Sequence, residues 1–144
     1  MSEHPAATRS NCVLVVDDDT AVRNLIRISL EREKLEVVTA LDGLEAIQHL
    51  EDERCSVLIL DLMMPRVSGW EVIEWLKLHP ERAPRTVVVV TAADRVVFSQ
   101  LDPEVVNAII VKPFDVYELA GYVSRCCEAP VDRDRRQKRL IGGN

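Results

Sequence analysis

The sequence predicts an α/β fold of the doubly wound type, in which helices cover both faces of a parallel β-sheet. Five short apolar runs, rich in β-branched residues, alternate along the chain with segments of helical periodicity. The runs are continuously apolar, which is typical of strands that are buried on both faces. Right-handed crossovers between such strands favour a three-layer sandwich with a five-stranded parallel sheet in the order 2-1-3-4-5.

The apolar runs give the expected strands. In chain order they are Val13–Val16, Val37–Thr39, Val57–Leu60, Val87–Val90 and Ala108–Val111. Each run is short and contains β-branched residues, whose stiff side chains suit a pleated sheet. Polar residues directly follow four of the five runs, so the chain is expected to leave the sheet at those points.

Helices are expected between the strands, each with a start signal. Thr20 can cap the first helix, whose apolar residues recur at helical spacing. Capping boxes open three others, at Asp42 with Glu45, Ser68 with Glu71, and Asp115 with Glu118. The segment between Asp94 and Asn107 predicts only a short helix, because Asp102-Pro103 interrupts its pattern.

Length and charge indicate one folded domain with two tails. The 144 residues are enough for a single domain core. We expect a flexible N-terminal tail over residues 1–11, the domain over 12–128, and a basic, disordered tail over 129–144. The formal net charge of −6 argues against general nucleic-acid binding. The exception is the C-terminal tail, which contains Arg133, Arg135, Arg136, Lys138 and Arg139.

The four cysteines predict reduced packing residues. Cys12, Cys55, Cys126 and Cys127 show no Cys-x-x-Cys spacing and lie in or beside apolar segments. The polar N-terminal run lacks the apolar stretch of a signal peptide, and no later run reaches membrane-spanning length. We therefore expect a cytoplasmic protein with no membrane partner.

Polar side chains stand at the carboxyl ends of the expected strands, where ligands bind in such sheets. The first strand runs into Asp17, Asp18 and Asp19, the third into Asp61, the fourth into Thr91 and the fifth into Lys112. Converging carboxylates repel each other by roughly 4 kcal/mol per close pair at an effective dielectric near 20. A divalent cation relieves this repulsion, and oxygen ligands select Mg²⁺ or Mn²⁺ over zinc.

Asp61 is the expected nucleophile of this site. A carboxylate beside a divalent cation and an ammonium group can attack phosphorus, because both cations neutralise charge on the transferring group. Thr91 can donate its hydroxyl to one phosphoryl oxygen, and Lys112 can make a charge-assisted bond to another. The product of this reaction is an aspartyl phosphate.

Four motifs, each at a strand end, resemble the receiver domain of two-component response regulators. They are Val13-Leu14-Val15-Val16-Asp17-Asp18-Asp19, Leu60-Asp61-Leu62-Met63-Met64-Pro65 with Gly69, Val90-Thr91-Ala92, and Val111-Lys112-Pro113-Phe114. The resemblance covers residues 12–128 and implies a flavodoxin-like fold.

The resemblance also implies a role for each site residue. Asp61 is the phosphoacceptor, taking its phosphoryl group from the phosphohistidine of a sensor histidine kinase or a phosphotransfer protein. Asp18 and Asp61 ligate Mg²⁺ directly, Asp17 acts mainly through water, and Met63 offers its backbone carbonyl. Thr91 is the switch hydroxyl and Lys112 the phosphate-binding lysine. The chain is then a signalling phosphoacceptor that controls a downstream protein, with a homodimer as a candidate assembly and no direct DNA binding.

The sequence departs from the family pattern near the switch. Receivers usually place an aromatic residue three positions before the lysine, and Ile109 stands there. Isoleucine cannot hydrogen-bond through its side chain, so the usual threonine–aromatic relay is not expected. Met63 and Ala93, which flank the phosphoryl group in this family, cannot orient water, and they predict slow self-dephosphorylation.

Two alternative functions stay open at this stage. Ile109 and the weak fourth helix favour a receiver that acts as an interaction module without phosphorylation. A Mg²⁺-dependent phosphatase of the haloacid dehalogenase type also uses a nucleophilic Asp. Such enzymes place a second Asp two residues later, where this chain has Met63.

Trp70 and Trp75 predict partial burial against the fold, with a partner-binding anchor as the alternative.

Overall fold

The computed structural model describes residues 9–52, 55–92, 99–128 and 139–142. The strands are β1 (Arg9–Val16), β2 (Glu36–Ala40), β3 (Cys55–Asp61), β4 (Thr86–Ala92), β5 (Ala108–Lys112) and β6 (Arg139–Gly142). The helices are α1 (Thr20–Arg32), α2 (Gly43–Asp52), α3 (Gly69–Leu78) and α5 (Val116–Glu128), with a 3₁₀ turn, η1, at Pro80–Arg82.

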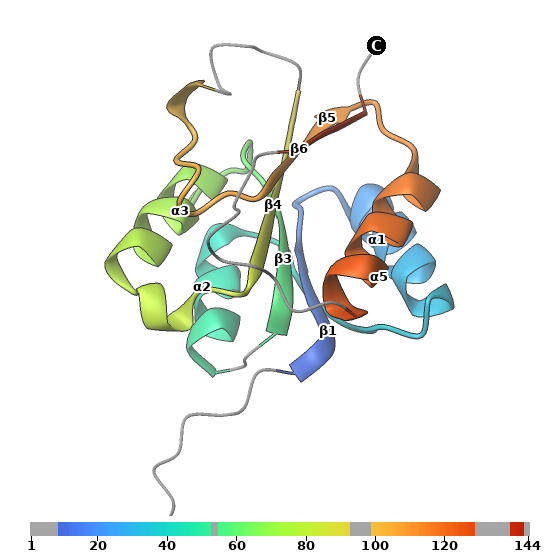
Figure 1. Cartoon of the computed structure of the whole chain (residues 1–144). Coiled ribbons are helices and arrows are strands. Elements are labelled where there is room, and N and C mark those ends of the chain that lie inside the picture. The colour runs from blue at the N-terminus through green and yellow to red at the C-terminus, as the bar shows by residue number, and fades with distance from the viewer. Residues whose placement is uncertain (1–8, 53–54, 93–98, 129–138, 143–144) are drawn as a thin grey trace, which may run out of the picture.

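The strands form one parallel sheet in the order β2-β1-β3-β4-β5-β6. The predicted doubly wound sandwich and its 2-1-3-4-5 order are confirmed. In Figure 1, α1 and α5 lie on one side of the sheet, while α2 and α3 lie on the other. The carboxyl ends of all strands therefore meet at one edge, which is the edge where the sequence predicts the site.

Alternate residues of each strand pack into two separate cores, as a sheet covered on both faces requires. In β1, Val13 and Val15 join the core beneath α1 and α5, whereas Leu14 and Val16 join the core beneath α2 and α3. Buried Ile109 belongs to the second of these cores. Because both faces are covered, the strands carry no polar alternation.

Strand β6 is a difference from the sequence prediction. It pairs parallel to β5, with Ala108 opposite Arg139 and Val111 opposite Gly142. Its four residues fall in the tail that we expected to be disordered, and the rest of that tail lies outside the described residues. An edge strand offers unpaired backbone N–H and C=O groups, and β6 satisfies those of β5. Residues 9–11, assigned above to the N-terminal tail, belong to β1, and Arg9 pairs with Cys55 of β3.

The helix starts agree with the predicted caps at three positions. Asp42, Ser68 and Asp115 each accept a backbone N–H from the first turn of α2, α3 and α5. The prediction was wrong for α1, where Asp19 rather than Thr20 is the cap and accepts from Ala21 and Val22 N–H. The short helix expected after Asp94 falls mostly on residues 93–98, which lie outside the described residues.

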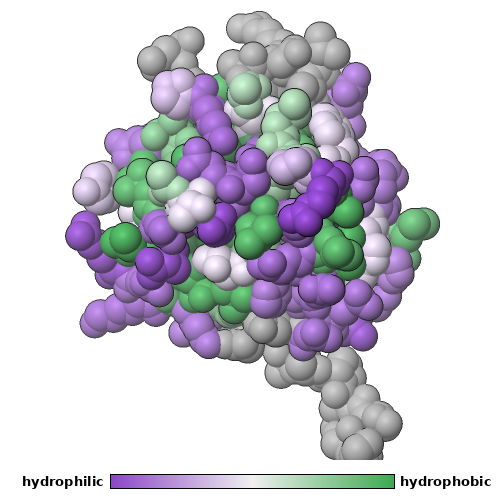
Figure 2. Space-filling view, turned by 180° about the vertical axis from the view of Figure 1, so that it is seen from behind, coloured by the Kyte–Doolittle hydropathy of each residue, from purple (hydrophilic) through white to green (hydrophobic). Residues whose placement is uncertain are grey.

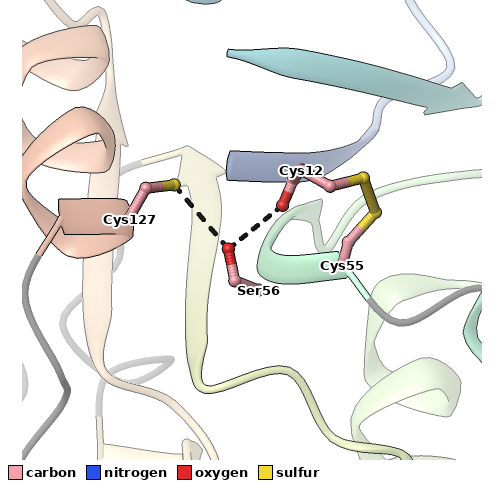
Figure 3. Close-up of a disulfide and its surroundings, with 4 residues drawn as sticks. All are labelled: Cys12, Cys55, Ser56 and Cys127. Atoms are coloured by element: carbon pink, nitrogen blue, oxygen red, sulfur yellow. Dashed lines mark hydrogen bonds between the residues drawn. A yellow bond between two sulfur atoms is a disulfide. The ribbon is translucent and has the colours of Figure 1, made fainter. Parts of the chain in front are cut away.

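A disulfide joins Cys12 of β1 to Cys55 of β3 at the amino edge of the sheet (Figure 3). The prediction of reduced cysteines was therefore wrong for this pair. Next to it, the Ser56 hydroxyl donates to the Cys12 carbonyl at 3.2 Å and lies 3.7 Å from the Cys127 sulfur. Burial raises the pKa of the Cys127 thiol above its usual range, so it stays protonated at neutral pH.

The surface keeps some apolar side chains in contact with water. Leu25, Leu44 and Leu78 are 52%, 55% and 77% exposed. Figure 2 shows hydrophobic residues in patches among hydrophilic ones on the rear face. Within the described residues, no helix has the length and apolar character that crossing a bilayer requires.

Candidate functional site

Three carboxylates converge at the carboxyl edge of the sheet, where the sequence predicted them. Asp17 and Asp18 follow the last residue of β1, and Asp61 is the last residue of the neighbouring β3. One ligand oxygen from each lies within 4.8 Å of the others. Asp17 and Asp61 are buried and Asp18 is exposed, so the cluster opens to solvent on one side.

Burial dominates the electrostatics of the cluster. The pKa of Asp61 is raised from 3.8 to about 6. Loss of hydration is the main cause of this rise, and the Asp17 and Asp18 charges contribute to it. The Met63 N–H, which donates to Asp61 Oδ1 at 3.0 Å, and the Lys112 charge both act to lower this pKa. The pKa of Asp17 is also raised, again mainly by burial.

Lys112 is the cation of the site. Its Nζ lies 3.7 Å from Asp61 Oδ2 and 3.9 Å from Asp17 Oδ2. Lys112 ends β5, and the Lys112-Pro113 peptide bond is cis. Lys112 carries one positive charge, so it offsets part of the charge of the three carboxylates when all three are ionised.

The donor set fits a hard divalent cation. Asp17 Oδ2 is buried and makes no hydrogen bond within the described part of the chain. Such an orphaned carboxylate oxygen is costly unless a cation compensates it. The neighbouring donors are also carboxylate oxygens, which suit Mg²⁺ or Mn²⁺. The candidate metal ligands are therefore the carboxylates of Asp17, Asp18 and Asp61. The Met63 carbonyl stays a prediction, because the contacts described for Met63 involve its N–H.

Thr91 lies at the same edge but its hydroxyl points elsewhere. The residue is buried near the end of β4, with its backbone paired opposite Val111 of β5. Its Oγ1 donates to the Ala92 carbonyl at 3.0 Å. To reach a phosphoryl group, the hydroxyl must give up this local bond. Ala93, expected to flank that group, lies outside the described residues.

The loop after β3 holds Asp61 through close backbone packing. Gly69 N–H donates to the Leu62 carbonyl at 3.1 Å, and Leu62 N–H donates to the Val90 carbonyl at 3.1 Å. A Cβ on Gly69 would collide with the Asp61 carbonyl oxygen and the Leu62 Cα. Glycine at this motif position therefore lets the loop fold back against the end of β3.

One residue that orders the site was missed by the sequence reasoning. The Arg23 guanidinium of α1 donates to the Asp17 carbonyl at 2.7 Å. This bond ties the first turns of α1 to the acidic loop, together with the Asp19 N–H, which donates to Asp17 Oδ1 at 2.9 Å. The available signal was the position of Arg23 one turn after the helix start, on the side that faces the strand end.

Comparison with known families gives a match over most of the chain. The profile described as the response regulator receiver domain matches residues 13–124. Response regulator MprA of Mycobacterium ulcerans is 43% identical over 84 residues, covering 58% of this chain and 35% of that protein. The alkaline phosphatase synthesis transcriptional regulatory protein PhoP of Bacillus subtilis is 33% identical over 112 residues, covering 77% and 46%. The chain thus spans less than half the length of these two relatives.

Solved structures share the fold over nearly their whole length. A CheY-like receiver domain protein of Methanospirillum hungatei has 28% identity and a TM-score of 0.69, covering 82% of this chain and 94% of that one. A signal receiver domain from Bermanella marisrubri has 30% identity and a TM-score of 0.73, covering 82% and 98%. Response regulator TrrA of Thermotoga maritima, solved in complex with Mg²⁺-BeF, has 30% identity and a TM-score of 0.69, covering 81% and 98%.

Proposed function

Because the chain belongs to the response regulator receiver domain family, we propose that it accepts a phosphoryl group on Asp61 and thereby switches the binding of a partner protein. The observation that carries this proposal is the convergence of Asp17, Asp18 and Asp61 within 4.8 Å, with Lys112 Nζ 3.7 Å from Asp61. This arrangement combines a buried nucleophile, a cation-binding cluster and a fixed ammonium group at one point.

The reaction transfers a phosphoryl group between two side chains. An Asp61 carboxylate oxygen attacks phosphorus in line with the phosphohistidine bond of the donor. The new O–P bond forms as the P–N bond breaks, and the leaving imidazole nitrogen keeps the electron pair. Only the ionised carboxylate can attack, and with a pKa of about 6 Asp61 is mostly ionised at neutral pH. Lys112 favours the ionised form and afterwards pairs with a phosphoryl oxygen.

Asp17, Asp18, Asp61 and the Met63 carbonyl would hold Mg²⁺ or Mn²⁺, which would supply charge neutralisation for the phosphoryl oxygens. The oxygen-only donors and the orphaned Asp17 Oδ2 support this assignment. The crystal structure of the related TrrA, in complex with Mg²⁺-BeF, also supports it. The bound cation would also offset the mutual repulsion of the carboxylates that hold it.

The phosphodonor is a sensor histidine kinase or a phosphotransfer protein, and the downstream partner is a second protein. We place the reaction in the cytoplasm and treat the chain as a phosphoacceptor rather than a turnover enzyme. The family relationship supports this role in two-component signalling. Action without direct DNA contact is proposed from the acidic charge of the chain.

The switch works without an aromatic relay. Phosphorylation gives the Thr91 hydroxyl a charged acceptor in place of the neutral Ala92 carbonyl. Charge-assisted hydrogen bonds are worth roughly 1.5–3 kcal/mol each, so the Thr91 and Lys112 bonds together supply several kcal/mol. A shift from mostly off to mostly on needs about 5.5 kcal/mol. Movement of β4 toward the phosphoryl group therefore carries the signal, while Ile109 remains packed in the core.

Incubation with Mg²⁺ and acetyl phosphate, followed by intact-mass measurement, tests the proposal. We expect the mass of one phosphoryl group to appear on the parent chain. The label should be absent with EDTA and absent in Asp61→Asn. Glu51→Gln, which changes an exposed acid on α2, is the matched control and should label normally. A labelled Asp61→Asn variant would place the modification elsewhere and reject the assignment.

A second candidate is a receiver that binds its partner without phosphorylation. The buried Ile109, at the position usually held by a mobile aromatic, favours it. The same mass experiment separates the two functions. A parent chain that binds Mg²⁺ but takes no label from acetyl phosphate or from any phosphorylated donor would support this candidate.

A further inference from the structure

An apolar groove runs between α2 and α3, away from the carboxylate cluster. Its volume is about 440 Å³, and its apolar lining is Ile47, Val67, Trp70, Trp75 and Leu78. We call it the α2–α3 groove. Both tryptophans are partly buried against the core, which agrees with the first interpretation of the sequence. Their remaining exposed surface lines the groove, and the anchor interpretation stays a prediction.

Two exposed leucines stand on the helices that form the groove. Leu78, the last residue of α3, is 77% exposed, and Leu44 on α2 is 55% exposed. Leu44 lies three residues before Ile47, so both fall on the same face of α2. Contiguous exposed apolar surface of this kind marks interaction sites, because its burial against a partner releases ordered water.

The charged lining of the groove is acidic. The two charged residues that line it are Glu71 and Glu74, both exposed on α3. Lys77 pairs with Glu74 at 3.3 Å and approaches Asp102 at 3.9 Å, whereas within the described residues Glu71 has no such ion pair. The His79 ring stacks on Trp75 with centroids 4.3 Å apart. A partner that covers the groove therefore places its own surface beside two carboxylates.

These features select the chemistry of the occupant. A second copy of the chain is disfavoured, because a symmetric contact brings Glu71 and Glu74 of both copies onto one surface. A groove between two helices with apolar anchors suits an amphipathic helix. We propose that the α2–α3 groove docks a basic amphipathic helix of another protein. Its apolar face contacts Trp70, Trp75 and Leu78, and its lysine or arginine side chains pair with Glu71 and Glu74.

The tryptophans provide a direct readout of this docking. The chain contains two tryptophans, and both line the groove, so tryptophan fluorescence reports on this site alone. The probe is a synthetic amphipathic helix of leucine and lysine, and its control has glutamate in place of every lysine. We expect the lysine peptide to shift emission to shorter wavelength and to reduce acrylamide quenching in a saturable way. The glutamate peptide should do neither.

Variants test the charge and the apolar contact separately. Glu71→Lys combined with Glu74→Lys should weaken binding of the lysine peptide about tenfold or more, since two charge pairs are lost. Leu78→Ser should weaken it about tenfold through the lost apolar contact. Leu25→Ser removes a comparably exposed leucine, 52% exposed on α1, and should leave binding unchanged. Circular dichroism of each variant establishes that the fold is kept.

Four results would overturn the proposal. The first is equal binding of the two peptides, and the second is equal binding by the Glu71/Glu74 double variant. The third is protection of the tryptophans from acrylamide quenching that increases with protein concentration when no peptide is present. That result would indicate a second copy of the chain as the occupant. The fourth is a free protein whose tryptophans are already shielded and become exposed in the double variant. That outcome assigns the groove to the chain's own basic C-terminal segment.

Discussion

Replacing Asp61 by asparagine should stabilise the metal-free protein above neutral pH, although it abolishes phosphoryl acceptance. The pKa of Asp61 is raised from 3.8 to about 6 in the folded chain, mainly by burial. A group with a raised folded pKa contributes stability that is fully present below its unfolded pKa. That stability is lost as the pH rises through the folded pKa. The ionised carboxylate thus lowers the free energy of unfolding of the metal-free protein above about pH 6.

The size of this destabilisation follows from the shift in the pKa of Asp61. The rise from 3.8 to about 6 is roughly two pKa units, and each unit corresponds to about 1.4 kcal/mol. The cost is therefore about 3 kcal/mol at pH 8. Asparagine has nearly the same shape and never ionises, so Asp61→Asn escapes this cost. For a chain of this length, the difference raises the melting temperature by roughly 10 °C.

Urea unfolding, followed by tryptophan fluorescence, measures the effect. With EDTA present, the advantage of Asp61→Asn over the parent should grow between about pH 4 and about pH 8 by roughly 3 kcal/mol. Saturating Mg²⁺ at pH 8 should stabilise the parent and leave the variant nearly unchanged. A variant no more stable than the parent at pH 8 without metal, or an advantage independent of pH, would refute the burial argument.

Three further substitutions test other parts of the account. Met63→Asn should speed loss of the phosphoryl group about tenfold or more, measured by intact mass over time, because a carboxamide can orient the attacking water. Gly69→Ala should lower the free energy of unfolding by about 1–3 kcal/mol, since its Cβ would collide with the end of β3. Cys55→Ser should lower it by about 4 kcal/mol, the loop entropy of a bridge spanning 43 positions. A reductant should weaken the parent equally and leave Cys55→Ser unaffected.

The sheet could be predicted because strands β1 to β5 contain uninterrupted apolar runs that are visible in the sequence. Their ends were less well defined. Strand β1 begins at Arg9 rather than Val13, since Arg9 pairs with Cys55 of β3 ahead of an irregularity in the register, and its polar side chain carries no apolar signal. Strand β6 was missed for another reason: its apolar part, Leu140-Ile141, is only two residues long and follows a basic segment, and it forms a strand because the edge of β5 is there to pair with it.

The carboxylate cluster could be predicted because parallel strands bring their carboxyl ends to one edge. Contacts that depend on the register between neighbouring strands could not be predicted. The bond between Cys12 and Cys55 joins residues 43 positions apart and requires β1 and β3 to be neighbours in a particular alignment. The Thr91 hydroxyl, expected to face the site, donates to the Ala92 carbonyl in the structure. A hydroxyl takes the acceptor within reach, and the sequence does not reveal which one that is.

Calorimetric titration with Mg²⁺ tests most directly that acids from β1 and β3 share one cation. The geometry of Asp17, Asp18 and Asp61 predicts one saturable site per chain. Asp18→Asn should weaken it about tenfold or more, because one carboxylate ligand is lost. Glu51→Gln should bind as the parent does. A parent chain that takes up no Mg²⁺, or an Asp18→Asn variant that binds it equally well, would contradict the account.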